Sequence, residues 1–98
     1  MITITYRDDG AYRSLTVEGH AGYAEKGKDI ICSAASALMM SLQSALEDSG
    51  TEYKIDAWDG YAEIACEDVT AKPWFYMAMR GFFTLASEYP AYYDVKSV

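Results

Sequence analysis

The feature that most constrains the fold is a pair of alternating segments that meet at a short turn. The stretch TEYKIDAWDGYAEIACED spans residues 51–68. Apolar residues alternate with polar or charged ones on both arms, which is the period-two pattern of a half-buried β-strand. Asp59-Gly60 between the arms is typical of a tight type I′ turn. We therefore predict a β-hairpin whose inward residues are Tyr53, Ile55, Ala57, Ala62, Ile64 and Cys66.

A second hairpin is predicted at the start of the chain. MITITYR alternates, with Ile2, Ile4 and Tyr6 on one side. YRSLTVEG also alternates, with Leu15 and Val17 inward. DDGA between the two segments is a turn signal, so we expect them to pair.

Apolar residues at helical spacing follow each hairpin. Asp29 suits the N-cap of a helix that runs to about Asp48, and Pro73 suits the first turn of a second helix that runs to about Glu88. The last eight residues form either a short strand or a tail. The order is ββαββα(β), which predicts an α+β fold with two helices on one face of an antiparallel or mixed sheet.

The composition indicates one domain over residues 1–98, since 51% of the residues are apolar and 14% are aromatic. The formal net charge of −7 would repel phosphate backbones, so we expect no direct nucleic-acid binding. A basic partner or substrate would instead be attracted. Two cysteines and one histidine make a poor metal set, so we expect neither a metal nor a cofactor.

The start of the chain alternates and does not resemble a signal peptide. No apolar run approaches the roughly 20 residues that span a bilayer, so no membrane partner is expected. We therefore expect a cytoplasmic protein with reduced cysteines. Met39, Met40, Trp74 and Met77 lie off the main apolar stripes of the two helices. If they are exposed, they form an apolar patch that favours a homodimer.

Cys32 is the first candidate for chemistry. It falls in the first turn of the predicted helix, where free N–H groups and the helix dipole favour a thiolate. Asp29 brings a negative charge that opposes this effect, and the sequence alone does not rank the two. The alternative is a small buried residue on a helix rich in alanine and serine. Cys66, on an inward strand face, is expected to be a core residue.

His20 is the only histidine, and it lies at the end of the second predicted strand. An imidazole that faces a helix N-terminus is well placed as a general base. The alternative is a loop histidine bonded to a backbone carbonyl. If His20 and Cys32 meet, they form a catalytic dyad, with the N–H of Cys32 or a neighbour as the expected oxyanion donor.

The loop between these two residues is rich in glycine, with Gly19, Gly22 and Gly27 within nine positions. The glycines serve either sharp turns or a mobile flap over the site. Asp29 either caps the helix or orients His20 as a third catalytic residue.

Three small or polar residues accompany the reactive pair. Ala21 follows His20 directly. Ser33 and Ser36 lie further along the predicted helix, where they allow close packing or bond back to helix carbonyls.

The stretch GHAGYAEKGKDIICSAASAL resembles the signature of the Prp family of ribosomal-processing cysteine proteases. That pattern has Gly-His-Ala, a glycine-containing loop, and then Gly-x-Asp-Ile/Val-x-Cys-x-Ala-x-Ser. The matching residues are Gly19, His20, Ala21, Gly27, Asp29, Ile30, Cys32, Ala34 and Ser36. Chain length, element order and an aromatic-rich second helix extend the resemblance more loosely over the whole chain.

The resemblance implies a small dimeric bacterial cysteine protease with Cys32 as the nucleophile and His20 as the base. It implies a basic large-subunit ribosomal protein as the substrate, from which an N-terminal extension is removed next to a short aromatic motif. Tyr23, Met40 or the second helix would line the pocket for that motif. Two alternatives remain from the residues themselves: a non-catalytic dimeric interaction module and a redox-sensing thiol protein.

Overall fold

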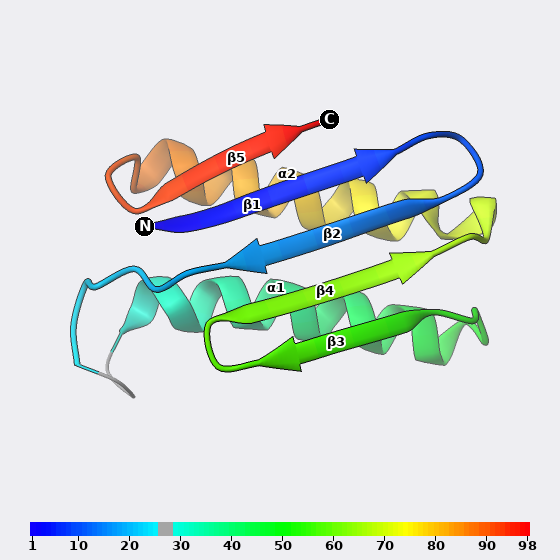
Figure 1. Cartoon of the computed structure of the whole chain (residues 1–98), viewed down its shortest axis with the longest axis horizontal. Helices are drawn as coiled ribbons and strands as arrows, with labels where there is room; N and C mark the ends of the chain where they lie inside the picture. The colour runs from blue at the N-terminus through cyan, green and yellow to red at the C-terminus, as the bar shows by residue number, and fades with distance from the viewer. Residues whose placement is uncertain (26–28) are drawn as a thin grey trace.

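The computed structural model describes residues 1–25 and 29–98. The elements follow the predicted order, and the last segment is a strand (Figure 1). From the N-terminus they are β1 (Ile2–Asp8), β2 (Arg13–Glu18), α1 (Ile30–Asp48), β3 (Lys54–Trp58), β4 (Tyr61–Cys66), the 3₁₀ turn η1 (Val69–Ala71), α2 (Lys72–Glu88) and β5 (Tyr93–Ser97).

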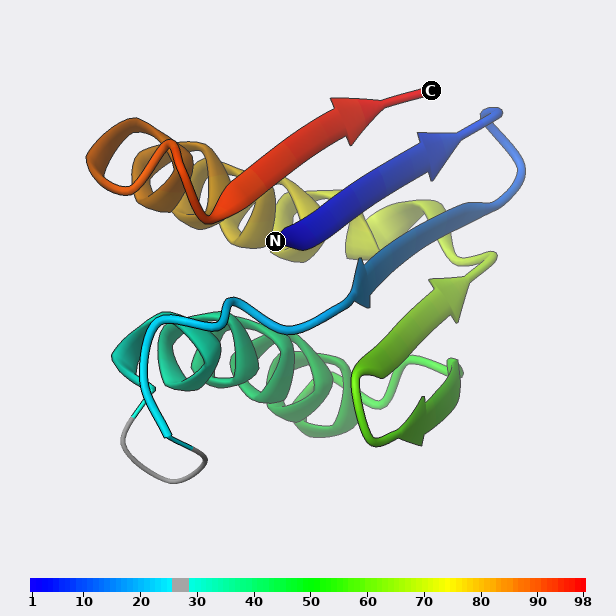
Figure 2. The ribbon, with the colours of Figure 1, turned by 60° about the vertical axis from the view of Figure 1, so that its left-hand side comes forward.

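The five strands form one mixed sheet in the order β3-β4-β2-β1-β5. Both predicted hairpins are present, and they join through antiparallel pairing of β2 with β4. β5 returns beside β1 and is parallel to it. Both helices cover the same face of the sheet (Figures 1 and 2). The expected α+β fold is therefore confirmed.

The core lies between this sheet face and the two helices. Inward residues of β1, β2 and β4 meet apolar stripes on α1 and α2. The residues that are almost completely buried are Ile2, Ile4, Leu15, Ile31, Leu46, Ile64, Phe75 and Phe82. Cys66 is also buried and belongs to this core, as predicted.

β3 departs from its predicted burial. All five of its residues are exposed, including Ile55 and Ala57, which we expected to face the core. The inward prediction for these two residues was wrong, because alternation identifies a strand face but not whether a helix covers it. β3 lies at the sheet edge, whereas Ile64 and Cys66 on the neighbouring β4 are buried.

The turn between β3 and β4 also differs from the predicted type I′. That turn needs a positive φ at both central residues. Only Gly60 has one, at +78°, and Asp59 does not. Glycine adopts a positive φ at little steric cost, so Gly60 is the turn residue that has this conformation.

The four helix residues expected to form one apolar patch divide between core and surface. Met39 is buried and Trp74 packs against the core, so neither belongs to a surface patch. Met40 and Met77 are exposed, on α1 and α2 respectively.

α1 corrects the expectation that no segment approaches the length of a membrane span. By length and composition alone, Ile30–Asp48 is long and apolar enough to cross a bilayer. This is weak support for a membrane span, because the core helix of a soluble protein passes the same test. Ile31, Leu42 and Leu46 of α1 are buried in the core of the fold.

Candidate active site

His20 and Cys32 line the same groove, which has a volume of about 1540 Å³. The groove follows α1 on one side and the β3–β4 hairpin on the other. Its lining includes Gly19, Gly22, Asp29, Ser33, Ser36, Met40, Ile55, Trp58 and Asp59. The structure therefore gathers most of the predicted site residues around one concave surface.

Cys32 lies in the first turn of α1, as the sequence predicted, and it is half-buried. Its Sγ accepts a hydrogen bond from the backbone N–H of Ala21 at 3.5 Å. This contact joins the segment that carries His20 to the helix that carries Cys32. A half-buried thiol at a groove wall can be reached by a substrate, whereas buried Cys66 cannot.

Asp29 is the N-cap of α1, and its buried carboxylate accepts four backbone N–H groups. Oδ1 accepts from Ile31 and Cys32, both at 3.0 Å. Oδ2 accepts from Tyr23 at 3.1 Å and Ala24 at 3.4 Å. The bond from the Cys32 N–H, more than the other three, holds the pKa of Asp29 below its usual value.

This cap decides two of the alternatives that the sequence left open. The described contacts of the Asp29 side chain are all to backbone N–H groups, so its role is to cap α1 and tether the preceding loop. The N–H of Cys32 is already donated to Asp29, so it is not a free oxyanion donor. The expected oxyanion donor was this N–H or a neighbouring one, and in this structure the Cys32 N–H is bonded to Asp29.

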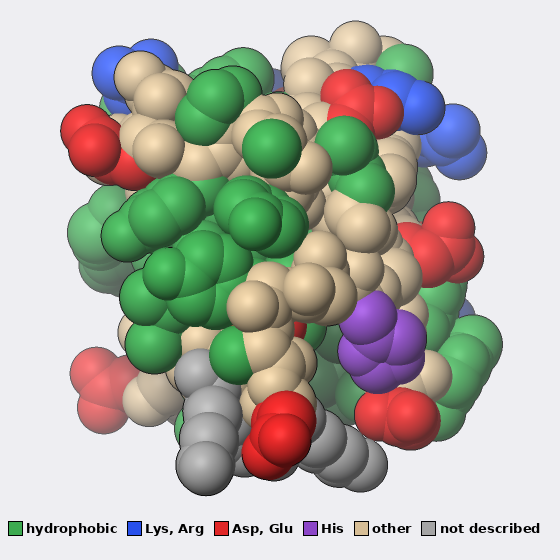
Figure 3. All heavy atoms as spheres, turned by 90° about the vertical axis from the view of Figure 1, so that its left-hand side faces the viewer, with side chains coloured by type: hydrophobic (Ala, Val, Ile, Leu, Met, Phe, Trp, Pro, Cys, Tyr) green, Lys and Arg blue, Asp and Glu red, His purple; other side chains and the backbone are tan. Residues whose placement is uncertain are grey.

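The imidazole of His20 is exposed and does not hydrogen-bond to Cys32 within the described part of the chain. Its Nε2 lies 4.0 Å from Oδ2 of Asp59, in the β3–β4 turn. The view of this end of the molecule shows the histidine on the surface beside an acidic side chain (Figure 3). The dyad partners thus share a groove without direct contact.

The residues on either side of His20 are anchored. Gly19 donates its N–H to the carbonyl of Gly60 at 2.8 Å, and its φ of +103° requires glycine. Ala21 is buried, and Gly22 also has a positive φ, of +67°. These glycines serve sharp turns, as one of the two readings predicted. Gly27, and with it the flap prediction for its part of the loop, lies outside the described residues.

The two serines have different surroundings. Ser33 donates its hydroxyl to the carbonyl of Asp29 at 3.0 Å, which is the back-bonding expected for a serine in a helix. Ser36 is exposed and lines the groove one turn further along α1.

The sequence did not point to Tyr93, which lies on the edge strand β5 and contacts the start of α1. Its hydroxyl donates to the carbonyl of Ile31 at 2.6 Å. Burial, followed by the nearby Cys32 and Asp29, raises the pKa of Tyr93 to about 12. The hydroxyl therefore stays protonated at neutral pH. The only signal was its place in a segment that we interpreted as a strand or a tail.

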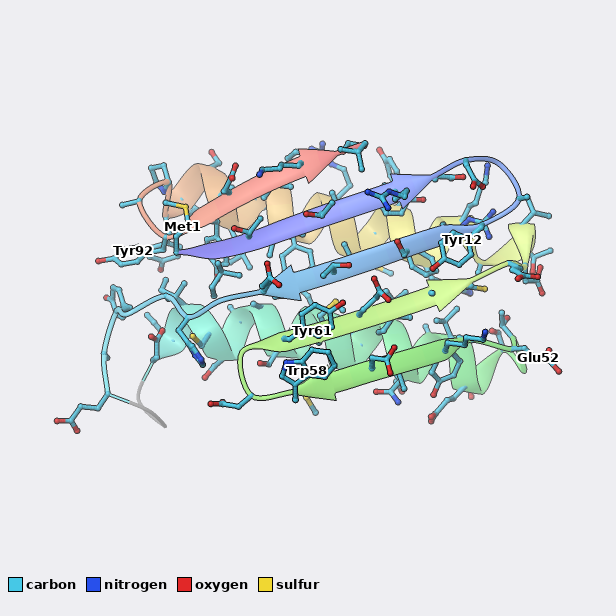
Figure 4. All side chains as sticks on the ribbon, viewed as in Figure 1. Met1, Tyr12, Glu52, Trp58, Tyr61 and Tyr92 are labelled. Atoms are coloured by element: carbon cyan, nitrogen blue, oxygen red, sulfur yellow. The ribbon has the colours of Figure 1, made fainter. Side chains whose placement is uncertain are left out.

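An aromatic surface lies beside the site, where Tyr23 packs edge-on against Tyr92 with ring centroids 5.3 Å apart. Hydrophobic side chains gather at this end of the molecule, where Figure 4 labels Met1 and Tyr92 (Figures 3 and 4). Among the described residues, no three His, Cys, Asp or Glu side chains come together as a metal-binding group.

Comparison with known proteins gives a consistent result. The family model described as cysteine protease Prp matches residues 1–94. The ribosomal processing cysteine protease Prp of Staphylococcus aureus is 36% identical over 45 residues. That stretch is 46% of this chain and 42% of the relative, so the match spans less than half of the relative's length.

Solved structures resemble the whole chain. The protein in a crystal structure from Streptococcus mutans is 31% identical in sequence to this chain. The match covers 100% of this chain and 94% of that chain, with a TM-score of 0.79. The S. aureus Prp in complex with a covalently linked product peptide is 23% identical, with full coverage of both chains and a TM-score of 0.89. The same S. aureus protein in complex with a substrate peptide gives a TM-score of 0.85.

Proposed function

The chain belongs to the cysteine protease Prp family, and from this premise we propose that it is a cysteine endopeptidase. Its proposed substrate is a large-subunit ribosomal protein, from which it removes an N-terminal extension next to a short aromatic motif. The observation that carries the proposal is the shared groove of His20 and Cys32, with the Ala21 N–H bonded to the Cys32 sulfur. The peptide complexes of the S. aureus Prp support a peptide as the substrate.

The proposed reaction is acyl transfer through a thioester. The Cys32 sulfur attacks the scissile carbonyl while its proton passes to the imidazole of His20. His20 then gives this proton to the leaving amine, and a water molecule releases the acyl group from sulfur. Because the imidazole and the sulfur are not in contact, the His20 side chain must turn toward Cys32 first, and catalytic contacts often tighten only when substrate binds.

Oxyanion stabilisation requires donors outside the helix cap. Asp29 occupies the N–H groups of Ile31, Cys32, Tyr23 and Ala24. A substrate carbonyl would therefore have to find other N–H groups, or displace the Asp29 carboxylate from one of these. Removing a single oxyanion donor typically costs a hundredfold or more in kcat, so this choice matters to the rate.

The groove is suited to a basic peptide with aromatic side chains. Among the described residues its charged lining groups are all acidic, namely Asp29, Asp48 and Asp59. Met40, Ile55 and Trp58 give it apolar walls. We propose that the aromatic motif packs against these walls and that the net charge of −7 attracts the basic substrate.

We also propose that the protein acts as a homodimer in the cytoplasm and does not bind nucleic acid directly. Exposed Met77 on α2 is an apolar group that a second copy would cover, whereas exposed Met40 on α1 lines the groove and serves as the comparison. Light scattering of wild type, Met40→Lys and Met77→Lys tests this proposal. A dimer that only one variant dissociates identifies the helix at the interface, whereas a monomeric wild type contradicts the proposal.

The decisive experiment incubates the protein with ribosomal proteins that carry native N-termini, followed by intact-mass analysis. One large-subunit protein should lose an N-terminal peptide. Cys32→Ala should abolish the cleavage while circular dichroism shows an unchanged fold. Full cleavage by this variant would disprove the thiol mechanism.

Thiol labelling separates the protease from the two alternatives. A protease predicts that Cys32 reacts far faster than buried Cys66 at neutral pH. An interaction module predicts slow labelling at both cysteines. A redox sensor predicts peroxide sensitivity without peptidase activity.

A further inference from the structure

The β3–β4 turn supports the backbone that carries His20. The carbonyl of Gly60 accepts the N–H of Gly19 at 2.8 Å, directly before His20. The turn itself is braced, because Trp58 and Tyr61 pair across it and their rings stack with centroids 4.2 Å apart (Figure 4). A well-supported turn therefore holds the end of β2 in place.

The imidazole of His20 rests on the same turn. A Cβ added at Gly60 would lie 2.8 Å from Nε2 of His20, so only glycine leaves room for the ring there. Oδ2 of Asp59 lies 4.0 Å from the same nitrogen. The two neighbouring turn residues thus form the surface against which the ring lies. Gly60 leaves space because it has no side chain, and Asp59 places a negative charge near Nε2.

On the other side of His20, the chain is bonded to the nucleophile. Ala21 donates its N–H to Sγ of Cys32 at 3.5 Å. The backbone of His20 is therefore fixed between the turn and the sulfur. Any approach of the imidazole to the sulfur would therefore come from rotation about the side-chain bonds of His20.

We propose that Asp59 is the positioning residue of His20, an inference that rests on the proposed protease function. With a proton on Nε2, the ring directs that N–H at the Asp59 carboxylate, 4.0 Å away, and Nδ1 is the nitrogen left to take the thiol proton. In this proposal the ring turns its Nδ1 edge toward Cys32 while Nε2 stays on the side of Asp59. When the S–H bond of Cys32 breaks and an N–H bond forms at Nδ1, the imidazolium then has the Asp59 carboxylate beside it. The carboxylate stays ionised and lowers the energy of this charged state.

Other charged groups around His20 have different partners. Asp29 is bonded to four backbone N–H groups of the loop and α1. The amino group of Met1 donates its hydrogen bond to the backbone carbonyl of His20, not to the imidazole ring. Asp59 is the carboxylate that the described part of the chain places within ion-pair distance of the imidazole.

Nuclear magnetic resonance tests the contact without any substrate, because His20 is the only histidine and its ring signals are unique. Asp59→Asn is a mild change, since Asn-Gly suits hairpin turns. We expect the ring signals of His20, recorded at one fixed pH, to change in this variant, because the charged group nearest Nε2 is lost. Asp56→Asn, on the same hairpin, should leave these ring signals unchanged.

Kinetics test the positioning role. With a peptide that spans the N-terminal extension, Asp59→Asn should lower kcat/KM about two- to fivefold, mostly through kcat. Asp59→Glu should restore part of the loss. Unchanged ring signals, or changed ring signals with unchanged kinetics, overturn the assignment.

A second pair of variants distinguishes the effect of a steric contact with the imidazole from the effect of backbone strain. Gly60→Ala and Gly50→Ala both place a side chain at a similar positive φ, +78° and +73°. Only at Gly60 does the new Cβ meet the imidazole, because the space at Gly50 is open. Gly60→Ala should therefore change the ring signals of His20 and kcat, whereas Gly50→Ala changes stability alone. Equal effects of the two variants on the ring signals overturn the assignment. If wild type cleaves no peptide, the protease proposal fails, while the ring signals still decide where the ring lies.

Discussion

The nucleophile and the base are held by different parts of the molecule in opposite surroundings. Cys32 is half-buried at the start of α1, where Asp29 takes up the free N–H groups around it. His20 is exposed, with 64% of its side chain accessible, and rests on the distant β3–β4 turn. Buried hydrogen bonds around the helix start therefore fix the sulfur, whereas the imidazole has only a long-range contact at the surface.

This difference has a mechanical consequence. The cap that fixes Cys32 consists of several backbone bonds within one buried region, so changing its position means rebuilding the helix start. The imidazole has one exposed ion pair and van der Waals contact with a glycine, and such exposed pairs contribute little energy. The base is therefore the component that can move when a substrate enters the groove.

The largest expected effect comes from removing either reactive side chain. Cys32→Ala and His20→Ala should each lower kcat/KM by about 1000-fold or more, and the double variant should lose no more than the worse single one. The reason is that the members of a catalytic unit act together. Initial rates on the extension peptide measure this, and independent, multiplicative losses would show that the two regions do not cooperate.

Gly19→Ala should disrupt the His20 region most strongly. The new Cβ would lie 2.5 Å from the carbonyl oxygen of Met1, at a φ of +103°. Left-handed backbone alone costs about 1–2 kcal/mol, so we expect a loss in unfolding free energy of at least about 2 kcal/mol. Urea denaturation measures it. Gly22→Ala, which has a positive φ but open space, is the matched control and should lose less.

Tyr93→Phe should weaken the Cys32 region by a smaller amount. The variant keeps the ring but loses the hydrogen bond to the carbonyl of Ile31. The expected cost is about 1 kcal/mol in unfolding free energy, with a changed rate of Cys32 alkylation. Tyr92→Phe is a neighbouring control for the loss of a hydroxyl. Equal destabilisation by both changes would mean that the Tyr93 bond is not specific.

The smallest effect is the acid dependence of the helix cap. The pKa of Asp29 is lowered in the folded state from 3.8, so its stabilisation is present above that value and is lost as pH falls below it. Thermal melts between about pH 2.5 and 6 should show a shallower decline for Asp29→Asn than for wild type. Parallel curves would show that the charge of Asp29 does not contribute.

Two further variants distinguish the two oxygens of this carboxylate. Asp29→Asn can keep the helix cap through its amide oxygen, but its NH₂ group cannot accept the N–H groups of Tyr23 and Ala24. Asp29→Ala loses both sets of bonds. We therefore expect Asp29→Ala to lower the melting temperature more than Asp29→Asn does.

Most elements were predictable from short-range patterns. The hairpins, the Asp29 cap and the bounds of both helices follow from residues close together in the chain, and the structure confirms them. The inward predictions for Ile55 and Ala57 were wrong, because the burial of a strand face depends on which helix packs against it. β5 pairs with β1 across nearly the whole chain, which periodicity does not encode.

The candidate site divides in the same way. The type and spacing of His20, Asp29 and Cys32 were enough to nominate them, and the family resemblance gave them roles. Which carboxylate faces which group was not predictable: Asp29 faces backbone N–H groups, and Asp59 faces the imidazole. The role of Tyr93 could not be predicted from the sequence, because its partner Ile31 lies 62 residues away in the chain and the two meet only in the folded structure.

By itself, the sequence determined where a thiol meets a capped helix start, since caps and turns are made by residues a few positions apart. Only the tertiary structure decided what surrounds the imidazole, because the β3–β4 turn reaches His20 through the pairing of β2 with β4. Such contacts depend on how the sheet is assembled, and local periodicity does not specify that.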